Sequence, residues 1–237
     1  MNENYVDYYI SVDGKVITRN VLKKMSVIIF AIFKFIFDRL FAFIGLLLFS
    51  PIMLIIAIII KIDSKGPIIF KQIRTGKGGR NIYVYKFRTM IVSNNVRDFT
   101  KKDKHTKVGT ILRKTSLDEL PQLFSILIGN MSFIGPRPWI PEYYDNMNDT
   151  QRHRYCVRPG LTGLAQANGR NNLTIFDKIN YDLEYIRNYS LHQDIKIIFL
   201  TIKAVIKGNG ADAGKDTIKN ELRKLKNQDA MRGKRSE

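Results

Sequence analysis

The sequence contains little cysteine, few acids relative to bases, and no recognisable secretory signal. Its single cysteine, Cys156, excludes an internal disulfide, so we expect the soluble part in a reducing compartment. A lone cysteine is also more often a small buried apolar residue than a nucleophile. The first twenty residues are polar and include acids, without the basic-then-apolar order of a signal peptide. We interpret residues 1–24 as an N-terminal extension.

The shortage of acids makes the chain strongly basic. Lys and Arg number 39 against 21 Asp and Glu, which gives a net charge of +18 and predicts an anionic partner. Nucleic acid, anionic lipid and a phosphorylated substrate all fit that description. A hydrophobic content of 45% over 237 residues excludes wholesale disorder and predicts one domain with attachments.

One long apolar run predicts a membrane segment within residues 25–65. Leu40 to Ile60 carries no charge and is about twenty residues long, enough to enter a bilayer. Ser50-Pro51 divides this run. Pro51 removes one backbone N–H, so we expect a kink there, with the Ser50 hydroxyl as a partner for the freed carbonyl.

The composition leaves two topologies open for this segment. A kinked span would place its two basic ends on opposite sides of the membrane. A re-entrant helix, broken at Ser50-Pro51, would return both ends to the cytoplasmic face, where Lys and Arg are favoured. The basic flanks favour re-entry; they are Lys34, Arg39, Lys61 and Lys65.

A β-hairpin is predicted after the membrane segment. Ile68–Ile73 and Asn81–Phe87 are rich in β-branched and aromatic residues, and a Gly-rich turn joins them. Lys86 and Arg88 are neighbours on one strand face, where they either point toward an anion or simply face solvent. Residues 92–107 are polar and lack periodicity, which predicts a loop.

Two adjacent acids, Asp118 and Glu119, form the centre of the predicted site. Val108–Leu112 should begin a helix that leads to them, and Ser116 has the capping-box spacing to Glu119. The apolar helix that follows would then hold both acids in its first turn, where its dipole keeps them ionised. The alternative is that the acids only cap this helix.

The residues around this pair suit a phosphate substrate. Two neighbouring carboxylates provide the hard oxygen ligands that Mg²⁺ prefers, and Mg²⁺ normally takes one or two of them together with phosphate oxygens. Arg113 and Arg137 add guanidinium groups that bind phosphate in a bidentate manner. Two prolines make the loop that presents Arg137 rigid.

The remaining chain adds a Gly-rich loop, two amphipathic helices and a basic tail. The loop, residues 158–166, is suited to approach a nucleotide or sugar closely. Asp177–Tyr189 and Asp194–Lys207 read as helices, and the second is apolar enough to lie on the bilayer surface. Residues 66–209 would be the catalytic domain, and 210–237 a mobile or helical tail with affinity for the membrane surface.

Five motifs in this order resemble the bacterial sugar transferases, the monotopic phosphoglycosyl transferases. They are Phe70–Gly76 (FKQIRTG), Tyr85–Met90 (YKFRTM), Leu112–Gln122 (LRKTSLDELPQ), Met131–Pro138 (MSFIGPRP) and Arg158–Gly163 (RPGLTG). The resemblance runs from about Lys34 to Lys207. Two departures occur: the family usually has Lys-Arg where this chain has Lys34-Phe35, so that Lys23, Lys24 or Arg39 substitutes as a headgroup anchor, and Gly-Asp where this chain has Gly129-Asn130.

The resemblance implies transfer of a sugar 1-phosphate from a UDP-sugar to a polyprenyl phosphate such as undecaprenyl phosphate, with release of UMP. Asp118 would be the nucleophile that forms an aspartyl phosphosugar, in a ping-pong course. Glu119, with Asp118, would hold Mg²⁺. The resemblance also implies a set of substrate-binding residues: Lys86, Arg88, Arg113, Arg137, Arg158, Gly160 and Asp182, the last matched together with Tyr185.

The expected fold is α/β and mainly helical. A re-entrant membrane helix, a small β-hairpin and amphipathic interfacial helices would surround a catalytic core. The expected location is the bacterial inner membrane, with the catalytic domain on the cytoplasmic face. A membrane-tethered polyanion-binding protein without catalysis is the alternative, but no nucleic-acid-binding module is visible, so we expect no nucleic acid partner. Neither the sugar nor the oligomeric state follows from the sequence.

Overall fold

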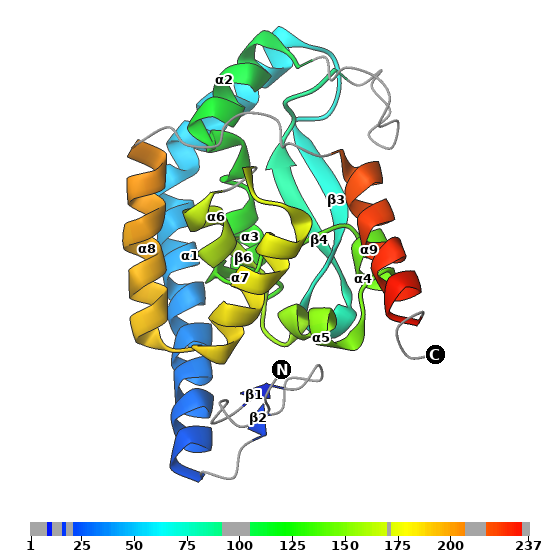
Figure 1. The fold of residues 1–237 in the computed structure, drawn as a ribbon. Helices are drawn as coiled ribbons and strands as arrows, with labels where there is room; N and C mark the ends of the chain where they lie inside the picture. Colours follow the sequence, from blue (N-terminus) through cyan, green and yellow to red (C-terminus); the bar gives the residue numbers. More distant parts are fainter. Residues whose placement is uncertain are drawn as a thin grey trace.

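The structure, a computed structural model, describes residues 9–10, 16–17, 21–91, 105–169, 172–206 and 217–233. Figure 1 shows one long helix, α1, along one side, with the other elements packed beside it. The helices are α1 (Val21–Asp63), α2 (Lys107–Thr115), α3 (Gln122–Leu127), α4 (Pro141–Asp145), α5 (Asp149–Arg152), α6 (Leu164–Asn168), α7 (Ile175–Arg187), α8 (Leu191–Ile206) and α9 (Ile218–Gly233). Single 3₁₀ turns are η2 (Lys77–Gly79), η3 (Leu117–Glu119) and η4 (His153–Tyr155). The mainly helical fold is as predicted.

The strands of the described part form three two-stranded sheets. The strands are β1 (Tyr9–Ile10), β2 (Val16–Ile17), β3 (Ile69–Thr75), β4 (Asn81–Phe87), β5 (Ser132–Ile134) and β6 (Gly160–Thr162). The antiparallel pair β3–β4 is the predicted hairpin, with Phe70 opposite Lys86 and Arg74 opposite Ile82. The sequence did not predict the short parallel pair β5–β6, in which Ser132 lies opposite Gly160. The predicted loop over residues 92–107 lies largely outside the described residues.

Helix α1 continues through Ser50-Pro51, so the predicted break interrupts one hydrogen bond and not the helical path. Pro51 has no N–H to offer to Leu47, four residues earlier. The Ser50 hydroxyl donates to that carbonyl oxygen instead, at 2.8 Å, as predicted. In Figure 1 the last part of α1 leans away from the direction of its first part, and Pro51 supplies the ordinary cause of such a bend.

One face of α1 packs on the rest of the chain, and its other face is apolar and exposed. Ala42 and Ile60 are buried, whereas Leu48 in the middle of the helix is 68% exposed. Within the described part, α1 is the one helix long and apolar enough to cross a membrane, and only 11% of its most apolar window is buried. A core helix of a soluble protein would be mostly buried, so α1 is a candidate membrane segment.

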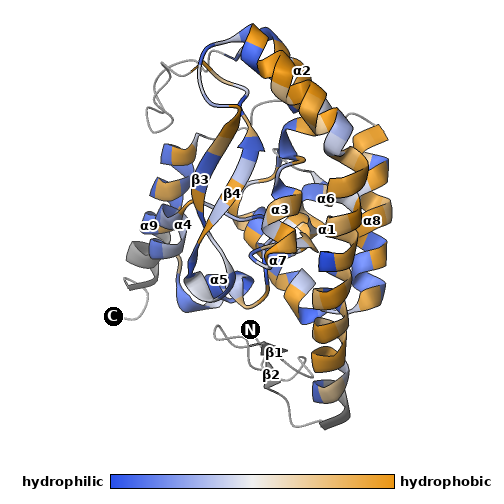
Figure 2. Cartoon of the chain, turned by 180° about the vertical axis from the view of Figure 1, so that it is seen from behind, coloured by the Kyte–Doolittle hydropathy of each residue, from blue (hydrophilic) through white to orange (hydrophobic). Residues whose placement is uncertain are grey.

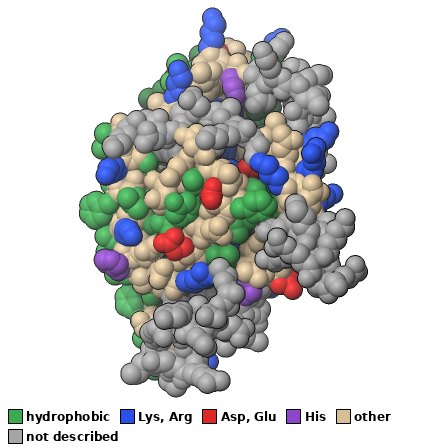
Figure 3. All heavy atoms as spheres, in the orientation of Figure 1, with side chains coloured by type: hydrophobic (Ala, Val, Ile, Leu, Met, Phe, Trp, Pro, Cys, Tyr) green, Lys and Arg blue, Asp and Glu red, His purple; other side chains and the backbone are tan. Residues whose placement is uncertain are grey.

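A second apolar surface lies on α8, beside α1. Figure 2 shows hydrophobic residues along both helices, and Figure 3 shows hydrophobic side chains at the margin of the molecule where α8 lies. The predicted amphipathic character of this helix is therefore confirmed. Its exposed apolar side chains are Leu191, Ile195, Ile198, Phe199, Ile202, Val205 and Ile206.

Residues 210–237 were predicted as a mobile or helical tail; in the structure, helix α9 lies within this range and is docked on the domain. Leu225 is 1% exposed and packs in a cluster with Trp139 and Tyr143. Glu221 is buried and accepts hydrogen bonds from the Tyr143 hydroxyl and from Lys178 Nζ. At the other end of the chain, α1 already begins at Val21, inside the extension predicted for residues 1–24.

Replacing Leu225 by Ala tests this docking. The change leaves a cavity at a side chain that is 1% exposed, so we expect a loss of about 2–5 kcal/mol in unfolding free energy. Thermal unfolding of the purified protein in detergent measures this as a lower midpoint. Lys226→Ala, on the exposed face of the same helix, is the matched control and should leave the midpoint unchanged. Equal midpoints for both variants would mean that α9 does not pack on the domain.

Candidate active site

The acid pair lies in the 3₁₀ turn η3, between α2 and α3, and not in the first turn of the α-helix α3 as predicted. The predicted capping box is wrong: Ser116 makes no side-chain cap and has a left-handed backbone, with φ of 58°. It is the one non-glycine residue with positive φ in the described backbone, a conformation that is concentrated at functional sites. Helix α3 begins only at Gln122. The left-handed residue turns the chain between α2 and α3, and the two acids follow it directly.

Two cations from distant parts of the chain meet the acid pair. Lys86 Nζ, from β4, lies 2.5 Å from Glu119 Oε1 and 4.0 Å from Asp118 Oδ2. Arg137, from the loop after β5, donates to the same Glu119 oxygen at 3.0 Å. The structure therefore brings together four of the predicted site residues in one ion-pair cluster.

The pKa values of the two carboxylates in this cluster shift in opposite directions. Burial acts to raise the pKa of Glu119, but Arg137 and Lys86 outweigh it and lower that pKa to about 2. Burial raises the pKa of Asp118, and Lys86 offsets this only in part. Among the described residues, Asp118 accepts no hydrogen bond from a side chain, and Lys86 at 4.0 Å is its ion-pair partner. Glu119 is thus held by cations, while the Asp118 carboxylate remains open to another group.

The donor atoms of this pair fit a magnesium ion. Within the described residues, no group of three or more His, Cys, Asp or Glu side chains is placed to hold a metal. Two adjacent carboxylates remain, and Mg²⁺ commonly takes one or two of these and completes its octahedron with water and phosphate oxygens. Since Lys86 and Arg137 share Glu119 Oε1, the Oε2 atom and the Asp118 oxygens are the available ligands.

Arg113 and Arg88, also predicted as substrate-binding residues, lie in different surroundings. Arg113, at the end of α2, is exposed; its Nη1 lies 3.0 Å from His105 Nε2, and its charge acts to lower the pKa of Asp118. Arg88 is buried and points toward the end of α1, where it donates to the carbonyl oxygens of Ser64 at 2.6 Å and Lys65 at 2.8 Å. Its observed contacts therefore fasten the hairpin to α1.

The Gly-rich loop contacts the backbone segments that carry the site residues. Arg158 donates to the Gly129 carbonyl oxygen at 3.0 Å and stacks over the Phe35 ring of α1. Gly160 donates its N–H to the carbonyl oxygen of Pro136, next to Arg137. A Cβ at position 160 would lie 2.1 Å from the backbone nitrogen of Gly135, so only glycine allows β5 and β6 to approach this closely. Both residues thus contact protein, and Gly160 helps to fix the loop that carries Arg137.

Asp182 forms a fully buried ion pair with Arg154, a residue for which no role was predicted. Arg154 donates to Asp182 Oδ2 at 2.6 and 2.9 Å and to the backbone oxygen of Arg137 at 2.9 Å. Its guanidinium group also lies 3.7 Å from the centre of the Trp139 ring. The only sequence signal was the pair of aromatic residues, Trp139 and Tyr155, between which Arg154 packs.

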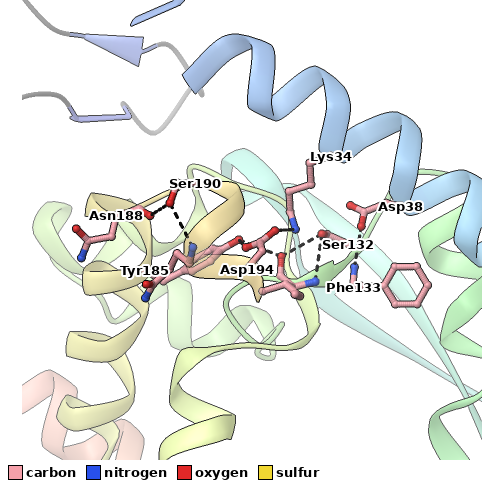
Figure 4. A network of polar contacts seen from close by, with 10 residues as sticks. Lys34, Asp38, Ser132, Phe133, Tyr185, Asn188, Ser190 and Asp194 are labelled. Atoms are coloured by element: carbon pink, nitrogen blue, oxygen red, sulfur yellow. Dashed lines mark hydrogen bonds and ion pairs between the residues drawn. The ribbon is translucent and has the colours of Figure 1, made fainter. Parts of the chain in front are cut away.

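Tyr185 belongs to a separate polar network, which fastens α7 and α8 to α1 (Figure 4). Its hydroxyl donates to Asp194 Oδ1 at 2.8 Å and to the Ile134 carbonyl oxygen at 3.3 Å. The other Asp194 oxygen pairs with Lys34 Nζ at 2.5 Å. Lys34 is therefore occupied inside the protein and is not available as a headgroup anchor. Arg39, one of the predicted substitutes, lies over the Phe35 ring.

The chain is similar to known sugar transferases over most of its length. A family model described as bacterial sugar transferase matches residues 29–208. A UDP-glucose:undecaprenyl-phosphate glucose-1-phosphate transferase of Klebsiella pneumoniae is 48% identical over 72% of this chain and 39% of that protein. The galactosyl transferase CpsE of Streptococcus agalactiae is 42% identical over 72% of this chain and 41% of its own length. This chain thus spans about two fifths of the length of these two relatives. It covers 90% of the uncharacterized sugar transferase EpsL of Bacillus subtilis, at 38% identity.

Two asparagine substitutions test whether Asp182 stabilises the fold or binds substrate. Asp182→Asn leaves the buried Arg154 guanidinium without its counterion, and we expect a loss of about 3–5 kcal/mol in unfolding free energy. Asp149→Asn removes the partner of Arg152 at the surface, where Asp149 is 95% exposed, and should cost less than about 1 kcal/mol. Thermal unfolding of both variants provides the comparison. If Asp182→Asn kept the parental midpoint but lost donor binding, Asp182 would contact substrate instead.

Proposed function

The chain belongs to the bacterial sugar transferase family, and we propose that it transfers a sugar 1-phosphate from a UDP-sugar to undecaprenyl phosphate, with release of UMP. The observation that carries this proposal is the unequal pair of carboxylates. Lys86 and Arg137 hold Glu119, whereas Asp118 is ionisable, buried and without a hydrogen-bonded side chain among the described residues. An ionised carboxylate next to fixed cations suits attack on a phosphorus atom.

The reaction would proceed in two displacements at phosphorus. In the first, an Asp118 oxygen bonds to the phosphorus that carries the sugar, and the bond from that phosphorus to the bridging oxygen of UMP breaks. UMP leaves with the electron pair, and an aspartyl phosphosugar remains. In the second, a phosphate oxygen of undecaprenyl phosphate attacks the same phosphorus. The bond to Asp118 then breaks, which restores the carboxylate and yields the lipid diphosphate sugar.

The cations of the cluster would stabilise the charge that develops on the phosphate oxygens. Lys86, 4.0 Å from Asp118, would lie next to the attacked phosphorus, and Arg137 contacts the same Glu119 oxygen as Lys86. Asp118 and Glu119 Oε2 are the groups that would hold Mg²⁺. When bound, this ion would neutralise the diphosphate and the departing UMP. The alternative of a polyanion-binding protein without catalysis gains no support from the relatives, which are named as transferases.

The contacts of α1 support a re-entrant or surface-lying anchor over a transmembrane span. The catalytic domain holds α1 at two places, by Asp194 on Lys34 and by Arg88 on the Ser64 carbonyl oxygen. Thirty residues of helix separate these places, about 45 Å, which exceeds the roughly 30 Å of hydrocarbon in a bilayer. If α1 crossed the bilayer, the polar domain that contacts both places would have to cross it too, which is prohibitive. We therefore propose that both ends of α1 lie on the cytoplasmic face.

The substitution Asp118→Asn tests the chemical role of this carboxylate. Asp118→Asn keeps the size of the side chain but removes the nucleophilic oxygen, so UMP release should fall at least about a thousandfold. Radiolabelled UDP-sugar with acid quenching reports whether the phosphosugar adduct still forms. Asp145→Asn, on the exposed surface of α4, is the control and should keep parental turnover. A persisting adduct in Asp118→Asn would remove Asp118 from this role.

Single-cysteine variants test the topology of α1. The native Cys156 is buried and is first replaced by Ala. Lys24→Cys and Lys65→Cys then place exposed thiols near the two ends of α1, and a membrane-impermeant maleimide is applied to intact cells and to inside-out vesicles. Both thiols should react only in the inside-out vesicles, as should the control Lys226→Cys on α9. Labelling of either α1 position in intact cells would establish a spanning helix.

A further inference from the structure

We propose that Arg74 is a second guanidinium of the donor site and binds, with Arg137, the phosphate that leaves with the nucleotide. This inference rests on the proposed function. Arg74 lies on β3, and neither the sequence motif nor the acid pair assigns it a role. Its position, its contacts and the charge around it lead to the same assignment.

The register of the hairpin places Arg74 on the face that carries Lys86. Phe70 lies opposite Lys86 and Arg74 opposite Ile82, and directly opposed residues of an antiparallel pair project to one side. Because side chains alternate along a strand, residues 70 and 74 share that side. Arg74 thus lies four positions along the hairpin from the Lys86 level, about 13 Å at the rise of a β-strand. A nucleoside diphosphate sugar bound at the acid pair extends over a comparable length.

A backbone contact brings the end of β3 to the loop that holds Arg137. Thr75, the residue after Arg74, donates its N–H to the carbonyl oxygen of Trp139 at 2.8 Å. Trp139 is two residues beyond Arg137, and its ring packs on the buried Arg154. Arg74 and Arg137 therefore lie on neighbouring backbone segments that are joined by a hydrogen bond.

Arg74 has no acidic partner in the part of the chain that the structure describes. Its Nη2 donates a hydrogen bond to the neutral Gln72 Oε1, at 2.5 Å. Burial, and then the nearby charge of Arg137, lower the pKa of Arg74 to about 10, although Tyr143 and the acids act in the opposite direction. A partly desolvated guanidinium next to a second one is unfavourable unless an anion joins them. A phosphate group is the anion that two guanidinium forks match best.

The order of charges along the site assigns the two phosphates. Lys86 lies at Asp118, so the attacked, sugar-bearing phosphate belongs there. Glu119 already engages Lys86 and one side of Arg137. Arg74 lies four hairpin positions from the Lys86 level, and its charge interacts with that of Arg137. We therefore assign to Arg74 the phosphate attached to the nucleoside. After the first displacement this phosphate belongs to UMP.

The test measures UMP binding to the purified full chain by isothermal titration calorimetry in the presence of a metal chelator, together with the KM for UDP-sugar. We expect Arg74→Met to weaken UMP binding about ten- to hundredfold and to raise KM more than it lowers kcat. Arg74→Lys, which keeps the charge but not the planar fork, should give an intermediate loss. Lys71→Met changes a cation of the same strand that faces the Tyr83 ring on the opposite side, and should bind UMP normally.

Parental UMP affinity in Arg74→Met would overturn the assignment, and so would a loss of affinity that matches a fall in the unfolding midpoint. If Arg74→Met does not fold, Arg74→Lys decides, because normal binding by that variant refutes a role for the guanidinium fork. Two other results would instead refute the proposed function: UMP does not bind the unchanged protein, or Asp118→Asn still forms the adduct.

Discussion

The ion-pair cluster on Glu119 is the interaction on which the site depends. One carboxylate oxygen joins Lys86 of the hairpin to Arg137 of the loop after β5, although these residues are 51 positions apart in the sequence. The two cations keep Glu119 ionised despite its burial, with a pKa of about 2. Both cations pair closely with Glu119. Its neighbour Asp118 therefore lies near positive charge without a close ion pair of its own. The nucleophilic role proposed for Asp118 requires both conditions.

The position of Arg137 is in turn fixed by groups that never need to touch substrate. The buried Arg154–Asp182 pair holds the backbone oxygen of Arg137, and the bare backbone of Gly160 holds that of Pro136. A buried ion pair adds little net stability, since desolvation opposes its attraction, but removing one partner is costly. Such a pair therefore suits the task of fixing one geometry. In the proposed reaction, an error of about 1 Å at this place would move the Arg137 guanidinium away from the phosphate that it would bind.

The sequence predicted elements with local patterns and failed where the outcome depends on tertiary contacts. The hairpin, the helix α2 and the two amphipathic helices follow from periodicity and turn residues, and the observed elements agree. The roles of the individual cations were harder to predict, because Lys86, Arg88 and Arg158 are all basic residues within their motifs. Only the fold determines that Lys86 meets the acids while Arg88 meets the end of α1 and Arg158 meets Phe35. The left-handed Ser116 likewise could not be read from a sequence that also matches a capping box.

Packing of α3 on α1 would set the depth of the proposed reaction relative to the bilayer. Gly45 of α1 faces Leu123 of α3, where an added Cβ would lie 3.4 Å from Leu123 Cδ1, an ordinary contact distance. On the open side of α3, Phe124 and Ile128 are exposed and apolar, like the outer face of α1, and we expect them to enter the same lipid. Asp118 precedes Phe124 by only six residues, across a tight turn. If these apolar side chains enter the hydrocarbon, the Asp118 carboxylate would lie near the level of the lipid phosphates. In the proposed reaction it would there meet a soluble nucleotide sugar from one side and a phosphate on a lipid chain from the other.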